Sequence, residues 1–150
     1  MAALRTFIAI GVPPAVLDTI IRIQSRFRSL GLRASWVKPG NIHLTLKFLG
    51  ETDPDRISGI QNKLTEILAS FTTFRLSLDS VGIFPNTKNP RILWIGLKHD
   101  EGTLQTFQSS IEKAMEGMGF PMDPQPFAPH LTLARMKFPK GNKQLQNELD

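Results

Sequence analysis

The tetrapeptide His-Leu-Thr-Leu occurs twice in this chain, at residues 43–46 and again at 130–133, an offset of 87 residues. The same shift lays the apolar segment 4–10 on the apolar segment 91–97, and each of these is followed by a helical pattern. Histidine has only three copies in 150 residues, and two of them occupy the matched positions. Two copies of a strand–helix–strand–helix unit explain this pattern better than coincidence.

The periodicity of apolar residues predicts the elements of each copy. Short alternating or continuous apolar runs predict strands, and apolar residues three or four apart predict amphipathic helices. The predicted strands are 4–10, 41–48, 74–81, 91–97 and 127–134, and the first of them is expected to be buried. In 41–48 the alternation puts Phe48 on the core side, and Trp94 is also expected in the core. The predicted helices begin after Pro13, Asp53 and Asp100, with Asp100 as the cap of the third helix, and residues 82–90 are predicted to form a loop.

The duplication also predicts what should follow the second copy of the motif. The helix near 54–70 should recur near 141–157 and the strand 74–81 near 161–168, whereas the chain ends at Asp150. We therefore expect residues 1–150 to form a single two-lobed domain that lacks its C-terminal end. A second lobe that is closed in a different way is the alternative.

Composition narrows the classes of partner and compartment. The formal net charge of +5 and the pI of about 9.9 favour phosphate-bearing partners without fixing specificity. The absence of cysteine excludes disulfides, thiolate zinc sites and a cysteine nucleophile. The apolar run 7–12 ends at Pro13 and is too short for a signal peptide or a membrane span. We expect a soluble, cytoplasmic monomer that does not associate with membranes.

The repeated motif places a histidine and a threonine on one face of each strand. In an alternating strand His43 and Thr45 point to the same side, about 7 Å apart along the chain, and so do His130 and Thr132. If the two strands face each other, one imidazole can take a proton from an attacking water while the other gives a proton to a leaving oxygen. The threonine hydroxyls can donate hydrogen bonds to non-bridging phosphate oxygens.

Other interpretations of the motif remain open at this point. Each His-x-Thr can simply be part of a solvated strand face. A metal site would need a third ligand, and neither motif is accompanied by His-x₃-His or clustered carboxylates, so we expect no metal. The sequence contains neither GxGxxG nor GxxxxGK[ST], so a glycine-loop nucleotide site has no support.

The chain resembles the 2H phosphoesterase superfamily, and most closely its RNA 2′,3′-cyclic phosphodiesterases, the LigT-like proteins also called 2′-5′ RNA ligases. The paired His-x-Thr-x motifs define the superfamily, and the flanking residues are similar to this branch. The residues that carry the resemblance are 5–10, 36–37, 41–50, 82–85, 90–94 and 127–135.

The resemblance implies an α+β fold in which the duplicated unit forms two lobes with antiparallel sheets around a central cleft. It also implies hydrolysis of a terminal RNA 2′,3′-cyclic phosphate to a 2′-phosphate, without metal or cofactor. His43 would be the proton donor to the leaving oxygen and His130 the acceptor from water, although the near-symmetric pair allows the exchanged roles. Thr45 and Thr132 would hold the phosphate.

Three further residues are weaker candidates for substrate binding. Lys47 shares the face of His43 and could contact phosphate, or it could simply be solvated. Arg135 follows the second motif as in relatives, but strict alternation puts it on the face away from His130, so a β-bulge or the strand end would have to bring it round. Phe84 could stack on a base or anchor its loop in the core.

Two other functions fit the same residues. One is a phosphodiesterase for a small cyclic nucleotide or a 2′-5′ linked oligonucleotide, with reversible 2′-5′ RNA ligation as a related possibility. The other, from a different class, is an RNA-binding module that keeps the fold without turnover. The expected partner of the leading function is RNA with a 2′,3′-cyclic phosphate end.

Overall fold

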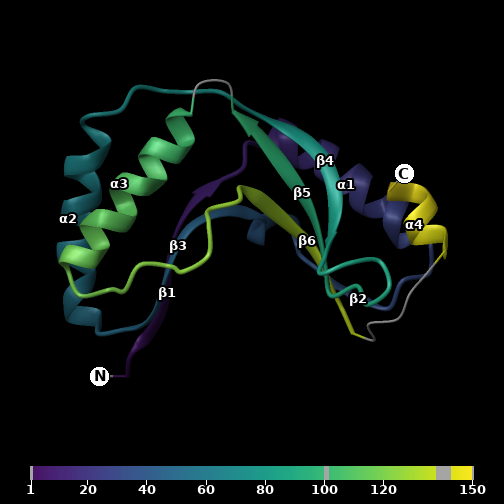
Figure 1. The fold of residues 1–150 in the computed structure, drawn as a ribbon, viewed down its shortest axis with the longest axis horizontal. Coiled ribbons are helices and arrows are strands. Elements are labelled where there is room, and N and C mark those ends of the chain that lie inside the picture. Colours follow the sequence, from purple (N-terminus) through teal and green to yellow (C-terminus); the bar gives the residue numbers. More distant parts are fainter. Residues whose placement is uncertain (1, 100–101, 138–142, 150) are drawn as a thin grey trace. The chain divides into compact units, whose positions relative to one another are not determined.

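The computed structural model describes residues 2–99, 102–137 and 143–149. Strands and helices alternate along most of this part of the chain (Figure 1). The elements are β1 (Leu4–Gly11), α1 (Pro14–Arg28), β2 (Ala34–Trp36), η1 (Pro39–Asn41), β3 (His43–Thr52), η2 (Pro54–Arg56), α2 (Ile57–Leu68), β4 (Leu76–Phe84), β5 (Ile92–His99), α3 (Thr103–Gly117), β6 (His130–Met136) and α4 (Lys143–Leu149).

The chain forms two compact units, each of which draws on three segments. Unit 1 is Met1–Ile10, Thr45–Ser77 and Lys98–Pro129, and unit 2 is Gly11–Leu44, Leu78–Leu97 and His130–Asp150. The described strands form a two-stranded sheet, β1-β3, and a four-stranded sheet in the order β2-β6-β5-β4. Helix α1 belongs to unit 2, whereas α2 and α3 belong to unit 1.

In unit 2, α1 packs against one face of the four-stranded sheet. The helix begins at Pro14 after an extended Pro13, and Gly31, with φ of +74°, follows its last turn. Apolar side chains of the helix and the sheet form the core of this unit. Its members are Ile20, Phe27, Leu93, Ile95, Leu131, Leu133 and Ala134, each at most 4% exposed.

The pairing of β6 with β5 contains a β-bulge. Leu93 lies opposite Ala134, but the next residue of β5, Trp94, lies opposite Thr132, so Leu133 is an extra residue on β6. Two consecutive residues of β6, Leu133 and Ala134, are therefore buried on the core side. Beyond the bulge the alternation of β6 is inverted relative to a regular strand.

A buried glutamine of α1 binds the carbonyl group of the extra residue. Gln24 is 5% exposed, and its Nε2 donates hydrogen bonds to Leu133 O at 3.0 Å and to Val37 O at 2.9 Å. The backbone N–H of Val37 also donates to Leu133 O, at 2.9 Å. The bulge is thus held by a helix and by the segment that follows β2, as well as by its own sheet.

Unit 1 repeats this arrangement at the first copy of the motif. The burial pattern of β3 matches that of β6 at the offset of 87: Leu46 and Lys47 are both buried, and Phe48 after them is 63% exposed. A buried glutamine of α3, Gln108, donates to Leu46 O at 3.0 Å. Leu46 is the counterpart of Leu133 at the offset of 87. In each unit, therefore, a buried helix glutamine donates a hydrogen bond to the equivalent carbonyl group of the motif strand.

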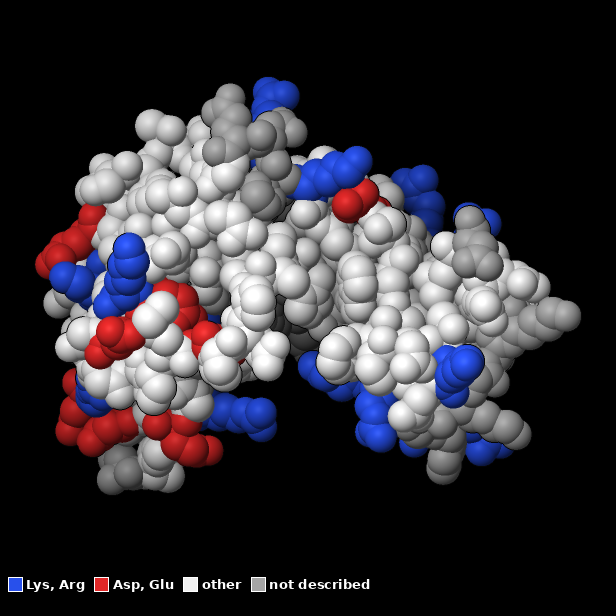
Figure 2. Space-filling model, in the orientation of Figure 1, with Lys and Arg blue, Asp and Glu red and all other residues white. Residues whose placement is uncertain are grey.

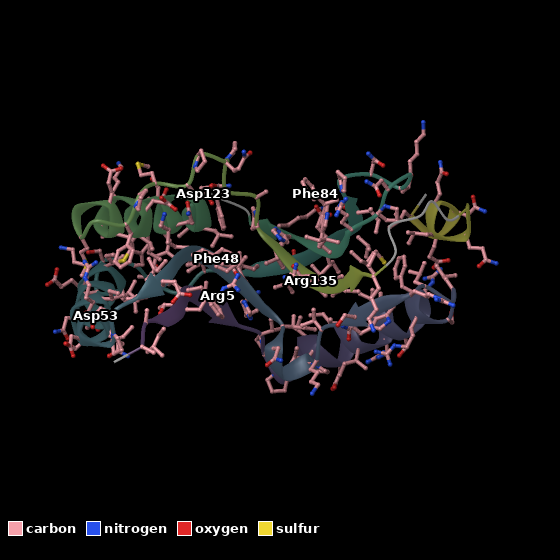
Figure 3. All side chains as sticks on the ribbon, turned by 90° about the horizontal axis from the view of Figure 1, so that it is seen from below. Arg5, Phe48, Asp53, Phe84, Asp123 and Arg135 are labelled. Carbon is pink, nitrogen blue, oxygen red and sulfur yellow. The ribbon has the colours of Figure 1, made fainter. Side chains whose placement is uncertain are left out.

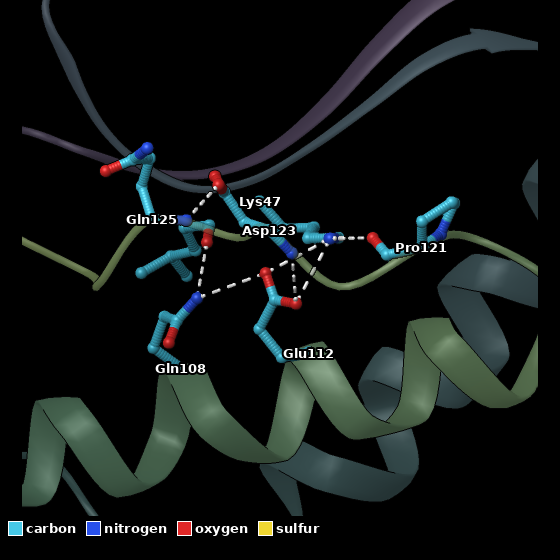
Figure 4. A network of polar contacts seen from close by, with 7 residues as sticks. Lys47, Gln108, Glu112, Pro121, Asp123 and Gln125 are labelled. Atoms are coloured by element: carbon cyan, nitrogen blue, oxygen red, sulfur yellow. Dashed lines mark hydrogen bonds and ion pairs between the residues drawn. The ribbon is translucent and has the colours of Figure 1, made fainter.

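A buried ion pair links β3 to α3 (Figure 4). Lys47 Nζ lies 3.1 Å from each carboxylate oxygen of Glu112, and both side chains are less than a tenth exposed. Lys47 Nζ also donates to Pro121 O at 2.6 Å, while Glu112 accepts from the backbone N–H of Asp123 at 3.3 Å and from Gln108 Nε2 at 3.5 Å. The network fixes the segment after α3 against β3.

Most predicted elements are present, and the repeat is reflected in the structure. All five predicted strands and all three predicted helices occur, with shifted ends, and the short strand β2 was not predicted. A helix was predicted to recur near 141–157, and α4 lies there. The prediction that Asp100 caps the third helix falls outside the described residues.

Four predictions about burial and bounds were wrong. The first strand was predicted to be buried, but Ile8 is the only residue of β1 that is. Lys47 was expected on the face of His43 and is instead buried in an ion pair, whereas Phe48, expected in the core, is exposed. Two consecutive buried residues in β3 break the strict alternation on which both expectations depended. The loop predicted from residue 82 begins later, because β4 continues to Phe84.

Replacing Gln24 by leucine should destabilise unit 2 without changing the volume of the core by much. Val37 O would lose the side-chain donor that binds it, so we expect the free energy of unfolding to fall by about 1–3 kcal/mol. The control is Gln105→Leu on the exposed side of α3, which should stay within about 0.5 kcal/mol of wild type. Equal stability of the two variants in urea unfolding would contradict this role.

Removing one partner of the buried ion pair should cost more than removing a surface pair. Lys47→Met leaves the Glu112 carboxylate buried without its cation, so we expect a loss of about 3–5 kcal/mol. The double variant Lys47→Met/Glu112→Leu should cost less than the sum of the single changes, because the uncompensated charge is gone. Lys63→Ala, at an exposed pair with Glu66, should cost less than about 1 kcal/mol. If the stability losses of the two single variants simply added in the double variant, the result would contradict an interaction between Lys47 and Glu112.

Candidate functional site

The bulge in β6 brings three predicted site residues to one face of the four-stranded sheet. Side chains of residues directly opposite each other on paired strands point to the same side. His130 lies opposite Gly96, Thr132 opposite Trp94, and Arg135 opposite Ile92. We call this side the motif face. The bulge that Arg135 needed in order to share a face with His130 is therefore present.

The motif face is the side of the sheet away from α1. Leu131 and Ala134, which alternate with the site residues, are at most 1% exposed in the core under α1. By contrast, His130 and Arg135 are exposed and Thr132 is half-buried. An imidazole, a hydroxyl and a guanidinium thus lie on neighbouring positions of one strand, which is a suitable set for an anionic phosphate.

Phe84 lies at the end of β4 on the same side of the sheet. It shares the parity of Gly82, whose backbone lies under the Trp94 ring, and its side chain is 60% exposed. Figure 3 shows Phe84 on the side of the sheet away from α1. Its backbone carbonyl accepts from the N–H of Arg91 at 2.9 Å, which closes the turn to β5. The exposed ring excludes the alternative that Phe84 anchors a loop in the core.

His43 begins β3 and is oriented by the short helix before it. Its Nδ1 lies 2.7 Å from Asn41 O, at the end of η1. Because a carbonyl oxygen can only accept, Nδ1 carries the proton in this contact, and Nε2 is then the nitrogen that carries the lone pair of the neutral ring. His43 is half-buried and belongs to unit 2, as do His130, Thr132 and Arg135.

Two predicted site residues belong to unit 1. Thr45 is half-buried on β3, two residues after His43. Lys47 is 5% exposed, and its ammonium group is already bound by Glu112 and by Pro121 O. Lys47 is therefore held as a structural cation within unit 1, and it is neither a solvated strand lysine nor a side chain presented to solvent for phosphate.

Charge differs between the two units. Among the described residues, unit 2 contains ten Lys and Arg against three Asp and Glu, a formal charge of +7, whereas unit 1 contains seven of each. On the face drawn in Figure 2, acidic side chains gather over the part of unit 1 that holds α2 and α3. The unit that carries both motif histidines is therefore the one that attracts anions.

Residues 2–99, 102–137 and 143–149 contain no group of three or more His, Asp and Glu side chains that could hold a metal ion. In the same part of the chain no helix has the length and apolar character needed to cross a bilayer.

Sequence reasoning missed three residues around the motifs. Gln24 occupies an apolar-stripe position of α1, between Ile20 and Phe27, and a polar residue in such a stripe is the signal that it binds something buried. Phe48 is the counterpart of Arg135 at the offset of 87, so the repeat itself could have indicated that these two residues occupy equivalent positions of the motif strands. Trp94 was expected in the core but contacts His130 on the motif face.

Comparison with known proteins agrees with this arrangement. The family model described as LigT like phosphoesterase matches the chain twice, at residues 10–94 and 95–150, as expected for a duplicated fold. An RNA 2′,3′-cyclic phosphodiesterase of Methanothermobacter thermautotrophicus is 31% identical over 94% of this chain and 76% of its own length. The corresponding protein of Archaeoglobus fulgidus is 35% identical over 89% of this chain and 73% of its own length.

Solved structures show the same fold. A crystal structure of a Thermus thermophilus protein superposes with a TM-score of 0.79 at 29% identity, covering 93% of this chain and 78% of that one. E. coli LigT complexed with 3′-AMP superposes with a TM-score of 0.74 at 23% identity, covering 89% and 73%, and shows the fold alone. Because the chain combines a duplicated α+β fold and paired motifs with these matches, it belongs to the LigT-like phosphoesterase family of the 2H superfamily.

Proposed function

We propose that this protein hydrolyses the terminal 2′,3′-cyclic phosphate of RNA to a 2′-phosphate, with His43 and His130 as the acid–base pair and without a metal ion. The observation that carries the proposal is the motif face, where the bulge aligns His130, Thr132 and Arg135. Membership of a phosphoesterase family and relatives named RNA 2′,3′-cyclic phosphodiesterase support the reaction class.

The proposed reaction balances with water as the only co-reactant. The imidazole of His130 accepts a proton from water as the water oxygen bonds to phosphorus. The bond between phosphorus and O3′ then breaks, and His43, which must enter the step with protons on both ring nitrogens, donates one of them to O3′. This leaves a 3′-hydroxyl and a 2′-phosphate. The contact between Nδ1 of His43 and Asn41 O supports Nε2 as the nitrogen that transfers the proton. The net reaction moves one proton from His43 to His130, and solvent exchange restores both rings.

Charge on the phosphate would be held by hydroxyl and guanidinium groups. Thr45 and Thr132 would donate hydrogen bonds to the non-bridging oxygens, where negative charge increases in the transition state. Arg135 would add a charge-assisted contact, and the net charge of +7 in unit 2 would draw the RNA end toward it. The exposed ring of Phe84 would stack on the terminal base.

The histidine pair is tested with a nucleoside 2′,3′-cyclic phosphate in the presence of a chelator. Wild type should yield the 2′-phosphate, and His43→Ala and His130→Ala should each lower kcat by about 10² to 10⁴ while circular dichroism stays native. Because one group must be protonated and the other not, the pH–rate profile should be bell-shaped and belong to the pair.

The other outcomes of this assay each exclude the proposal. Loss of wild-type activity in chelator would exclude the metal-free reaction, and full activity of either variant would exclude the acid–base pair. A 3′-phosphate product would exclude cleavage at O3′. Cleavage of 2′-5′ linked oligonucleotides alone, or RNA binding without turnover, would assign the protein to one of the two alternative functions.

The contribution of Arg135 is tested by comparison with Lys137, a neighbouring cation that is not part of the register between β5 and β6. Arg135→Gln removes a charged donor from the motif face, so we expect kcat/KM to fall by about 10- to 100-fold. Arg135→Lys should recover part of this loss, because it restores the charge without the bidentate geometry. Lys137→Gln, an exposed cation two residues on, should change kcat/KM by less than about threefold. Equal effects at the two positions would mean that Arg135 acts only through net charge.

A further inference from the structure

His130 lies beside an aromatic ring that the proposed chemistry does not use. The centroids of the His130 and Trp94 rings are 6.2 Å apart at an interplanar angle of 63°, an edge-on contact. The two residues come from neighbouring strands: Trp94 on β5 lies opposite Thr132, and His130 on β6 lies opposite Gly96. The imidazole therefore sits diagonally across from the indole on the motif face.

The position of the indole depends on two glycines. A Cβ atom built on Gly82 would lie 2.6 Å from Cη2 and 2.8 Å from Cε2 of Trp94, and closer still to Cζ2. The six-membered ring of Trp94 thus occupies the space that a side chain at residue 82 would fill. A Cβ on Gly96 would lie 3.4 Å from Cζ3 of the same ring. The indole therefore packs on the backbone of Gly82 in β4 and lies next to the backbone of Gly96 in β5.

This placement limits where the His130 ring can turn. The residue directly opposite His130 is Gly96, which has no side chain to pack against the imidazole. The rigid indole of Trp94 packs beside the imidazole from the diagonal position instead. The backbone of Gly82 in turn fixes the indole. Proton transfer depends on the orientation of the ring nitrogen, so a contact of this kind affects turnover more than binding.

We propose that Trp94 is a positioning residue for His130, and that residue 82 must be glycine because the indole fills the place of its side chain. The inference rests on the proposed role of His130 in proton transfer. It predicts that one methyl group at residue 82, on a different strand from either ring, displaces the indole and with it the imidazole.

The test compares Gly82→Ala with Gly11→Ala, a strand glycine of unit 2 that has no atom within 4 Å of its built Cβ and no positive φ. Two quantities are measured for each variant: steady-state kinetics with a nucleoside 2′,3′-cyclic phosphate, and the imidazole proton resonances of His130, assigned by their absence in His130→Asn. The chain has only three histidines, so these resonances are few.

Gly82→Ala should lower kcat by at least about tenfold with KM within about threefold of wild type, and Gly11→Ala should change neither. The resonances of His130 should move in Gly82→Ala and in Trp94→Leu, by more than those of His43. In a Trp94→Leu background the further change Gly82→Ala should cost little, because the clash is already removed. If Gly82→Ala does not fold, Trp94→Phe, which keeps an aromatic edge, should retain more of kcat than Trp94→Leu.

Wild-type kcat and unmoved His130 resonances in Gly82→Ala would overturn the proposal, even if the melting temperature fell. Equal kcat in Trp94→Phe and Trp94→Leu would also overturn it. If wild type shows no hydrolysis, the proposed function fails on its own. The displacement of the His130 resonances then still supports the contact with Trp94, and its absence overturns it.

Discussion

The extra residue in β6 decides which side chains the four-stranded sheet presents to solvent. A regular strand with the same sequence would turn Arg135 toward α1, where Leu131 and Ala134 are fully buried, and an unpaired guanidinium there would cost several kcal/mol. With Leu133 as an extra residue, the apolar side chains stay in the core and the arginine joins His130 and Thr132. One backbone irregularity therefore satisfies both the packing of unit 2 and the composition of its motif face.

The two motif strands share a backbone feature but carry different side chains on it. Gln24 and Gln108 bind equivalent carbonyl groups, and each motif strand buries two consecutive residues before exposing the next. At those positions the halves have diverged. Ala134 of one half corresponds to Lys47 of the other, whose charge is compensated by Glu112 in the core of unit 1. The burial pattern of the motif strand is thus the same in both copies, while among the described residues unit 2 carries a formal charge of +7 and unit 1 a formal charge of zero.

Much of the fold could be predicted because its signals are local and occur twice. The offset of 87 identified the equivalent strands, and apolar spacing located the helices. The side on which Lys47 lies could not be predicted, because strict alternation contains no signal for a second buried residue in succession. The identity of its partner, Glu112, depends on how α3 packs against β3, 65 residues away along the chain. Arg135 was suspected only because of the family resemblance, and the register of β5 with β6 supplied the reason for its orientation.

Binding of the phosphate group at the motif face can be followed by nuclear magnetic resonance during titration with adenosine 2′-monophosphate. We expect the largest chemical-shift changes in β6 on His130, Thr132 and Arg135. Leu131 and Ala134, on the core side of the same strand, should change much less. Changes confined to scattered surface lysines, or equal along β6 irrespective of face, would contradict it.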